Sequence, residues 1–311
     1  MNQSQWPLVY ITIVNYKGYD DTIECLDSWA KSNYTNIQLV VVDNASPDDC
    51  YERLQIAEKS RGDFVLLQSG YDGGWPGGCN FGMAWALEKG AEFVCFVDND
   101  TVADPDFLRF LMETMLKDKN YGVVGGKILS YRWPERVANA GGLYFPALGY
   151  AWARDRHTDR RGEDKTQVVD WVTAGILVRR AAIQRVGKMR EDYFHHTSDV
   201  EWPMRIKRNG FKVVYQPKAR IYHKGESVEK GNHAYSYYYE RRNSIYLLMD
   251  QFGAASLFGI AVRVFKMFID VLLSSFTGQK YMPRLVARIL GDISRNRRGQ
   301  ADLSDFKNPT V

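Results

Sequence analysis

Four apolar stretches in the first hundred residues most limit the folds that this chain can adopt. They lie at residues 9–15, 37–42, 63–67 and 92–97 and are rich in valine, isoleucine and leucine. Segments with apolar residues at helical spacing separate them, at residues 21–31, 51–59 and 81–89. Because the apolar stretches are continuous rather than alternating, we expect strands buried on both faces, as in a mostly parallel sheet with helices on each side. The sequence therefore predicts an open α/β fold, and such folds bind ligands at the carboxyl ends of their strands.

The pattern after residue 120 is more mixed. Apolar stretches that favour strands lie at residues 122–129, 137–145, 168–178, 211–216 and 219–223. A helix is expected to begin near Asp104-Pro105, where Asp can cap the helix and Pro can occupy its first position. Another is expected at residues 199–209, because Gly210 ends a segment of helical apolar spacing. We expect one body over residues 1–250, whose sheet changes character near residue 120, followed by a helical tail at residues 251–311.

Positive charge is concentrated in the last fifth of the chain. Residues 253–311 contain nine basic and four acidic side chains, whereas the first 252 residues are nearly neutral. This distribution argues against a nucleic-acid-binding protein, which would carry basic charge over its main body. Within residues 252–277, Arg263, Lys266 and Asp270 share one face of an amphipathic helix, and a wide apolar face lies opposite.

Two interpretations of this tail remain open. The helix can pack on the main body or in a homodimer, or its apolar face can lie in a membrane surface, with the cations of residues 252–298 drawn to anionic lipid. No stretch reaches the roughly 18 uncharged apolar residues that a membrane span needs. Residues 1–7 lack the basic start of a signal peptide, and the four cysteines show no C-x-x-C spacing. We therefore expect a cytoplasmic protein, peripheral on the inner face of the cell membrane.

The strongest local motif is Asp98-Asn99-Asp100, at the end of the fourth apolar stretch. Alternate residues of an extended chain point the same way, so both carboxylates can face one ligand. Oxygen ligands of this kind suit Mg²⁺ or Mn²⁺, which can in turn bind a diphosphate. His223 ends another apolar stretch and is either a further metal ligand or an ordinary strand-end histidine. The alternative for the two aspartates is a pair of solvated acids at a strand-to-loop junction.

Two further polar segments follow predicted strands. Asp43 and Asn44 come after the second stretch, where a carboxylate can accept a hydrogen bond from a nucleobase or ribose, or form a capping turn into the next helix. A glycine-rich loop is expected after the third stretch, and its glycines would allow a ligand to approach the backbone closely. This loop contains Gly73, Gly74, Gly77, Gly78 and Asn80. Its spacing matches neither a P-loop nor a dinucleotide-binding motif.

Asp199 lies at the start of the helix expected at residues 199–209. Two roles are open for it. A carboxylate at a helix start can be an N-cap, and a carboxylate near bound substrates can be a general base.

In combination these motifs are more specific than any one of them. Their order along the chain is V-V-D-N-A-S, a glycine-rich segment ending in G-G-C-N, F-V-D-N-D-T, W-V-T-A-G, S-D-V-E-W-x-x-R and P-K-A-R-I-Y-H. Over about residues 8–250 this order resembles the family-2 glycosyltransferases, most closely the bacterial rhamnosyl- and galactofuranosyltransferases of surface polysaccharide synthesis. The resemblance implies the Rossmann-like GT-A fold over residues 1–250. Its donor half would extend to about residue 120 and its acceptor half over about 121–250.

The resemblance also implies an activity. The family inverts the anomeric carbon while it moves a sugar from a nucleoside-diphosphate sugar, here of UDP or dTDP type, to a hydroxyl of a saccharide or lipid-linked saccharide. Asp199 matches the catalytic base, and Asp98, Asp100 and His223 match the site of a divalent metal, Mg²⁺ or Mn²⁺. The residues that match donor contacts are Asp43, Asn44, Gly73, Gly74, Gly77, Gly78, Asn80 and Asp98. Those on the acceptor side are Trp171, Ala174, Gly175 and Trp202, and Arg241-Arg242-Asn243 resembles a motif of unclear role after the catalytic domain.

One position departs from the family pattern. The family usually has Glu immediately before the catalytic Asp, and this chain has Ser198. Loss of that carboxylate would reduce the like-charge repulsion that raises the pKa of the base, or would move part of the role to Glu201 as a secondary acid. The absence of Q-x-x-R-W, a signature of processive members, favours transfer of one or a few sugars. Two alternatives stay open. A catalytically silent nucleotide-sugar-binding protein is suggested by Ser198, and a sugar-phosphate nucleotidyltransferase would need more glycine than residues 15–18 contain.

Overall fold

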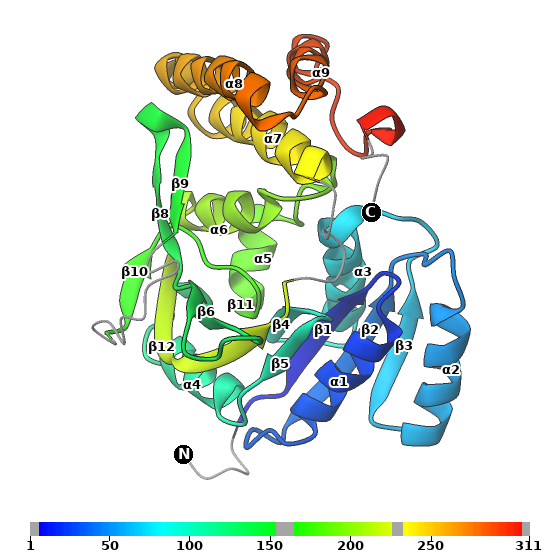
Figure 1. The fold of residues 1–311 in the computed structure, drawn as a ribbon. Coiled ribbons are helices and arrows are strands. Elements are labelled where there is room, and N and C mark those ends of the chain that lie inside the picture. The colour runs from blue at the N-terminus through cyan, green and yellow to red at the C-terminus, as the bar shows by residue number, and fades with distance from the viewer. Residues whose placement is uncertain (1–5, 154–164, 226–232, 307–311) are drawn as a thin grey trace.

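A large sheet lies at the centre of the computed structural model, which describes residues 6–153, 165–225 and 233–306 (Figure 1). One half of this sheet consists of parallel strands in the order β4, β1, β2, β3. Their bounds are β1 Val9–Asn15, β2 Ile37–Asp43, β3 Phe64–Gln68 and β4 Phe93–Asp98. Each end lies within one residue of the predicted stretch. The parallel sheet predicted from the sequence is therefore confirmed.

The other half of the sheet is mixed. β11 (Ile176–Arg179) runs antiparallel to both β4 and β6 (Tyr121–Ser130), and β12 (Lys212–His223) runs parallel to β6. Short strands pair at the margins, namely β5 Thr101–Ala103, β7 Val137–Asn139 and β10 Gln167–Val169. The predicted strands at 211–216 and 219–223 are one continuous strand, whose register with β6 shifts between Gln216 and Arg220.

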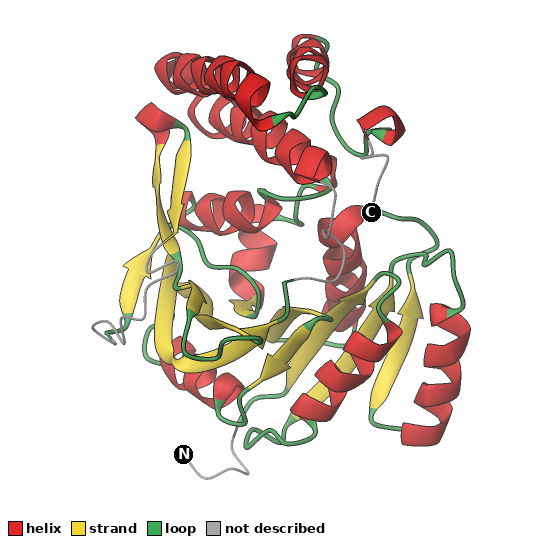
Figure 2. Cartoon of the chain, viewed as in Figure 1, coloured by secondary structure: helices red, strands yellow, loops and turns green. Residues whose placement is uncertain are grey.

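Helices cover both faces of the sheet, as predicted (Figure 2). One face packs against α1 Tyr19–Trp29, α2 Cys50–Arg61 and α4 Phe107–Met115, and the other against α3 Gly74–Glu88, α5 Arg180–Val186 and α6 Ser198–Arg208. In β1, Val9, Ile11 and Ile13 enter the first core, whereas Tyr10 and Val14 enter the second. Successive side chains of a strand point to opposite faces, so a continuous apolar strand needs a helical layer on each side.

The prediction of a glycine-rich loop before residue 81 is wrong, because α3 already begins at Gly74. The glycines bring this helix unusually close to the sheet. A Cβ atom on Gly78 would overlap the Val14 side chain, and one on Gly82 would overlap Thr12. Tertiary packing on β1 therefore stabilises a helix that intrinsic glycine propensity disfavours.

A further helical layer covers α6 on the side away from the sheet (Figure 1). It consists of α7 His233–Phe252, α8 Leu257–Thr277 and α9 Met282–Ser294, which share one apolar core. Tyr246 and Leu248 of α7 pack with Val200 and Met204 of α6. The helical extension predicted after the α/β body is present, and α7 is part of it.

A two-stranded hairpin extends from the sheet to this helical layer (Figure 1). Its strands are β8 Gly142–Phe145 and β9 Tyr150–Ala153, joined through a short 3₁₀ turn, Pro146–Leu148. The turn reaches α8 at Gly259, where any side chain would overlap the Pro146 carbonyl oxygen. The hairpin tip and the start of α8 are therefore in direct contact.

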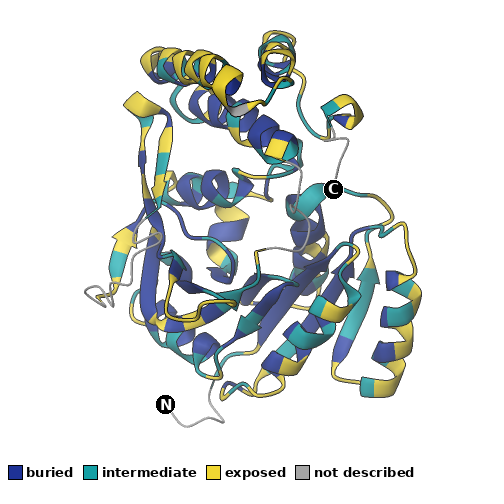
Figure 3. Cartoon of the chain, viewed as in Figure 1, coloured by how far each residue is buried: buried dark blue, intermediate teal, exposed yellow. Residues whose placement is uncertain are grey.

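The helix predicted at residues 252–277 is present as α8, but its faces differ from the prediction. Arg263 and Asp270 face inward together with Met267 of the predicted apolar face, whereas Lys266 is exposed. Arg263 is buried and donates from Nε to Ser244 Oγ at 3.1 Å, and Asp270 accepts a hydrogen bond from the Tyr237 hydroxyl at 2.9 Å. The outer side of α8 is exposed (Figure 3) and carries eight large apolar side chains, which we call its apolar face. Its exposed members are Leu257, Phe258, Phe265, Phe268, Ile269, Leu272, Leu273 and Phe276. None of the described helices combines the length and apolar character needed to cross a bilayer.

Candidate active site

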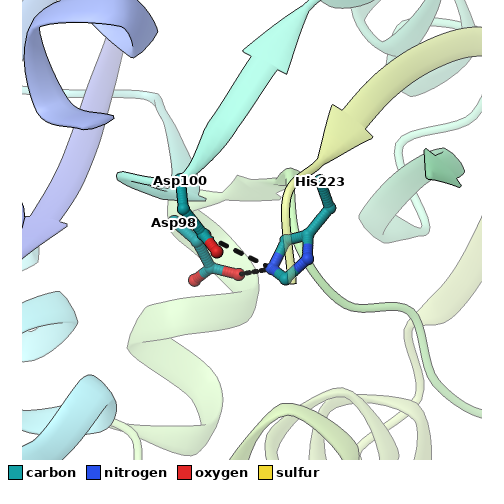
Figure 4. Close-up of side chains that lie close together, drawn as sticks. All are labelled: Asp98, Asp100 and His223. Atoms are coloured by element: carbon teal, nitrogen blue, oxygen red, sulfur yellow. Dashed lines mark ion pairs between the residues drawn. The ribbon is translucent and has the colours of Figure 1, made fainter. Parts of the chain in front are cut away.

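An acidic pair and a histidine meet at the carboxyl end of β4 (Figure 4). After Asp98 the chain turns into β5, which pairs antiparallel with the end of β12 and sets Thr101 opposite His223. This pairing places His223 Nε2 3.5 Å from Asp98 Oδ2 and 3.4 Å from Asp100 Oδ1. The structure thus brings together the three residues predicted as metal ligands.

The electrostatics of this cluster suit a cation. Burial raises the pKa of the Asp100 carboxyl, His223 opposes that shift, and Asp98 adds to it. A divalent ion would offset both the burial and the like-charge repulsion. One ligand atom from each residue lies within 4.8 Å of the others. Because two carboxylates and one imidazole form a hard donor set, the cluster can hold Mn²⁺ or Mg²⁺.

Asp43 lies at the end of β2 in a buried hydrogen-bond network. Its carboxylate accepts hydrogen bonds from Asn15 Nδ2 at 2.8 Å and from Ser46 Oγ at 2.6 Å. The Asn15 Oδ1 atom in turn accepts a hydrogen bond from Asn99 Nδ2 at 3.4 Å, so the network reaches the Asp98–Asp100 turn. Asn44 is also buried and donates to the Gly74 carbonyl at 2.9 Å. These contacts hold the ends of β1, β2 and β4 in one arrangement.

The start of α3 lies between this edge and the segment that precedes α6. Gly74 has a φ of 64°, and a Cβ atom on it would overlap the carbonyl of Phe194. The Asn80 amide is engaged on both sides, since it donates to Met189 O and accepts from Met189 N, each at 2.9 Å. Gly73 and Gly77 lie beside the Tyr71 ring. Asn80 and Gly78 thus serve packing, whereas Gly74 lies against Phe194 and Gly73 and Gly77 lie against Tyr71.

Asp199 is the second residue of α6 and is half-buried. Within the described parts of the chain, no hydrogen bond or ion pair holds its carboxylate, and the helix has no side-chain cap. This arrangement does not match the N-cap alternative. Further along the helix, the Trp202 ring packs edge-on against Phe96 of β4, with centroids 5.7 Å apart. The helix that carries Asp199 is therefore docked on the strand that ends in Asp98.

Glu201, Trp171 and Trp202 are buried in the interior of the protein. The Glu201 carboxylate is 1% exposed and accepts hydrogen bonds from Arg205 Nε and Gln251 Nε2, both at 2.8 Å. Trp202 is fully buried and donates from Nε1 to the Gly187 carbonyl at 3.0 Å. Trp171 is buried in the core beneath the hairpin. These three side chains are therefore packed in the interior of the protein.

The turn before β11 is tightly constrained. Ala174 adopts a φ of 43° and Gly175 a φ of 94°. A Cβ atom on Gly175 would contact the Phe107 ring, which explains the need for glycine.

The segment that leads into α6, residues 193–197, has an unusual backbone. Phe194, His196 and Thr197 all have positive φ values, of 59°, 56° and 73°. Such conformations cost free energy in residues other than glycine and persist where surrounding contacts enforce them. Here the buried amide of Asn243 in α7 donates from Nδ2 to the carbonyls of Tyr193 and His195, both at 2.8 Å. Asn243, of the Arg241-Arg242-Asn243 motif, therefore holds the strained segment in front of Asp199.

Two residues of the site lie outside the set predicted from the sequence. Asn15 links Asp43 to Asn99, and it ends an apolar strand just as Asp43 and Asp98 do. The same strand-end criterion could have identified it. Asn243 carries no strand-end signal. The resemblance of Arg241-Arg242-Asn243 to a family motif singled it out without a role, because its partners are about fifty residues away in the sequence.

The fold and the metal cluster together define a GT-A glycosyltransferase. In agreement, residues 9–187 match the model of glycosyl transferase family 2. This match covers more than half of the chain, so the protein belongs to that family and is a glycosyltransferase enzyme.

Individual proteins similar to this chain include two curated relatives and a solved structure. The dTDP-rhamnosyl transferase RfbF of Shigella flexneri is 26% identical over 217 residues, which cover 69% of this chain and 68% of that protein. The N-acetylglucosaminyl-diphospho-decaprenol L-rhamnosyltransferase of Mycobacterium tuberculosis is 34% identical over 88 residues, covering 27% of this chain and 28% of that protein. A mannosyltransferase from Pyrobaculum calidifontis, solved with GDP-Man and Mn²⁺, has the same fold, with a TM-score of 0.57 and 15% identity over 95% of this chain and 89% of that one.

Proposed function

We propose that this glycosyltransferase moves a sugar, with inversion, from a UDP- or dTDP-type nucleotide sugar to a hydroxyl of a saccharide or lipid-linked saccharide. Asp199 is the general base of this proposal. The observation that carries the assignment is its half-buried carboxylate, which has no partner among the described residues and lies on a helix docked against β4 through Trp202 and Phe96. Glu201 is not needed as a second acid, because Arg205 and Gln251 already occupy its carboxylate.

The reaction needs a base, a stabilised leaving group and alignment of two substrates. The Asp199 carboxylate takes the proton of the acceptor hydroxyl while that oxygen bonds to the anomeric carbon. The bond from this carbon to the donor diphosphate breaks on the opposite side, which inverts the centre. Asp98, Asp100 and His223 would hold the metal ion, which when bound supplies Lewis-acid stabilisation of the diphosphate.

The donor is proposed to lie along the carboxyl edge of β1, β2 and β4. Asp43 and Asn44 shape the end of the nucleotide site through their buried networks, and Gly73, Gly74 and Gly77 border it. RfbF, whose name specifies a dTDP-rhamnose donor, supports this donor class for the present chain. Ala174 and Gly175 lie on the proposed acceptor side.

We further propose that the acceptor is linked to a lipid. The protein would then lie in the cytoplasm, against the inner face of a membrane. The mycobacterial relative is named for a diphospho-decaprenol acceptor, which supports this acceptor class. The solvent-directed apolar face of α8 supports the membrane position.

Replacement of Asp199 by Asn tests the base. We expect transfer to fall about 10²–10⁴-fold, the usual contribution of general-base catalysis, while donor binding measured by thermal shift stays unchanged. Glu88→Gln, an exposed acid on α3, is the matched control and should keep wild-type activity.

Three other outcomes would contradict the base assignment or the proposed reaction. Near-wild-type transfer by Asp199→Asn would contradict the base assignment. Nucleotide-sugar binding without turnover of any donor by the wild type would favour the silent binding protein. Formation of a nucleotide sugar from a sugar phosphate and a nucleoside triphosphate would favour the nucleotidyltransferase.

A further inference from the structure

The rotation of α8 about its own axis is fixed by contacts on its polar side. Arg263 is 6% exposed and is bonded to Ser244, and Asp270 accepts hydrogen bonds from Tyr237 and from Arg241 Nη2 at 3.3 Å. Turning the helix over would break this largely buried set of charged contacts. Its eight large apolar side chains are therefore held outward, with Phe276 88% and Phe265 66% exposed. A surface of this kind on a soluble protein usually marks an interaction site.

The hairpin β8–β9 adds a second exposed apolar strip. Leu143 lies opposite Trp152, and Phe145 lies opposite Tyr150, so the four exposed side chains share one face of the hairpin. Leu148 at the tip is 50% exposed. Since the tip contacts α8 at Gly259, the strip begins where the apolar face of α8 begins.

The charges around the apolar face of α8 and the hairpin indicate which kind of partner binds there. Between residues 253 and 298 the acids are Asp270 and Asp292, and both are mostly buried in ion pairs. The exposed charges of the same region are cations, namely Lys266, Lys280, Arg284, Arg295 and Arg297. In a two-fold dimer through this same surface, residues 253–298 of a second copy would offer the same cations and no exposed acid to neutralise them. Anionic lipid would neutralise them, while the phenylalanines enter the boundary between headgroups and acyl chains.

We propose that the apolar face of α8 and the tip of the β8–β9 hairpin form one docking surface for an anionic lipid bilayer. α8 lies in the plane of the interface as the main contact, and Leu148 with Tyr150 forms a second contact that sets the tilt of the molecule. This inference rests on the membrane position in the proposed function and identifies the residues responsible. Aromatic side chains with a polar group, such as Tyr150 and Trp152, suit the interfacial depth.

Vesicle co-sedimentation of the full chain tests the surface. The wild type should bind vesicles of phosphatidylcholine with phosphatidylglycerol and bind pure phosphatidylcholine more weakly. In the variant Phe265→Ser/Leu272→Ser, we expect the apparent Kd for the mixed vesicles to rise about tenfold or more, because interfacial affinity scales with buried apolar area. Leu148→Ser/Tyr150→Ser should raise the Kd about threefold by the same argument. Ile56→Ser is the control, since Ile56 is 69% exposed on α2, which packs on the other face of the sheet.

Equal binding by the wild type and the α8 variant would overturn the inference. So would a change from dimer to monomer in sedimentation velocity without loss of vesicle binding, which would assign the α8 face to a second copy. Vesicle binding is measured without substrate, so it can fail while transfer to a detergent-solubilised acceptor persists. Conversely, inactivity of a protein that binds vesicles would contradict the proposed function and leave the docking surface intact.

Discussion

The metal cluster and the segment before Asp199 are supported in different ways. Asp98, Asp100 and His223 are placed by strand ends and by the pairing of β5 with β12. The segment at residues 193–197 is held from outside the sheet. Its carbonyls bind Asn243 of α7, and the neighbouring Asp192 carbonyl accepts from the Gly299 N–H at 2.6 Å.

This difference means that the metal ligands and the surroundings of the proposed base depend on different parts of the fold. The sheet alone can position the metal ligands, whereas the arrangement around the proposed base depends on the helical layer and the segment that follows it. Substitutions in that layer should therefore reduce turnover and leave metal binding intact. Four substitutions sharpen or break this distinction.

Of these four substitutions, Asp100→Asn should have the largest effect on activity. Loss of one of two carboxylates weakens the metal site, and we expect transfer to fall about 10³-fold or more. Without metal the variant should be at least as stable as the wild type, because burial raises the pKa of Asp100 and the amide carries no charge. Differential scanning fluorimetry with and without Mn²⁺ measures both effects. Glu52→Gln on α2 is the control, and a full Mn²⁺-dependent rise in Tm for Asp100→Asn would contradict the metal assignment.

Asn243→Ala should come next. Removal of the amide frees the carbonyls of Tyr193 and His195, and the strained backbone can relax away from its present form. We expect kcat to fall about 10²-fold, since displacement of a catalytic group by about 1 Å has effects of this size. The Mn²⁺-dependent thermal shift and the KM for the donor should stay unchanged. Asn33→Ala, at an exposed position, is the matched control, and an equal loss of metal binding would show that the two regions are not independent.

Arg298→Ala should have a smaller effect in the same direction. Arg298 donates to both carboxylate oxygens of Asp250, at 2.7 and 2.9 Å, and to Asp192 at 3.3 Å. We expect about a tenfold fall in kcat and a loss of about 1–3 kcal/mol in the free energy of unfolding. Urea denaturation and steady-state kinetics measure the two quantities. Arg295→Ala, which is exposed near the end of α9, should change neither one.

Glu201→Gln should leave catalysis nearly unchanged. The carboxylate is buried against Arg205 and Gln251, so its loss should reduce stability by about 1–3 kcal/mol through a weakened charged hydrogen bond. We expect kcat within about threefold of the wild type when the folded fraction is taken into account. A much larger fall in kcat, at unchanged stability, would restore Glu201 as a secondary acid.

The sequence was sufficient for the parts of the molecule that repeat a simple local pattern. Continuous apolar strands predicted the sheet, and Asp98-Asn99-Asp100 at a strand end predicted two carboxylates that can face one ligand. For His223 the local pattern left two roles open, and the family resemblance assigned it to the metal site that the structure brings together. Local patterns failed where packing decided the outcome. Gly74–Asn80 has a loop-like composition, yet close packing on β1 makes it helical.

Contacts between distant segments were also beyond local patterns. No periodicity shows that Asn243 meets the carbonyls of residues 193–196, or that the Arg205–Gln251 pair occupies Glu201. The rotation of α8, which decides the side chains that face inward, also depends on contacts between distant segments. The amphipathic pattern predicted the helix but not the division of its faces. Met267 of the predicted apolar face is buried in the helical core, and Arg263 and Asp270 also face inward because α7 offers Ser244, Tyr237 and Arg241 as partners.

The hydrogen bond from Gly299 to Asp192 has a consequence for the order of events during synthesis of the protein. The metal cluster needs the chain only as far as His223, and the strands that support it can assemble while later residues are still being translated. The segment before Asp199 reaches its final arrangement only after Gly299 has left the ribosome. The nascent chain can therefore form the cluster of Asp98, Asp100 and His223 before the segment in front of Asp199, the proposed base, reaches its final arrangement.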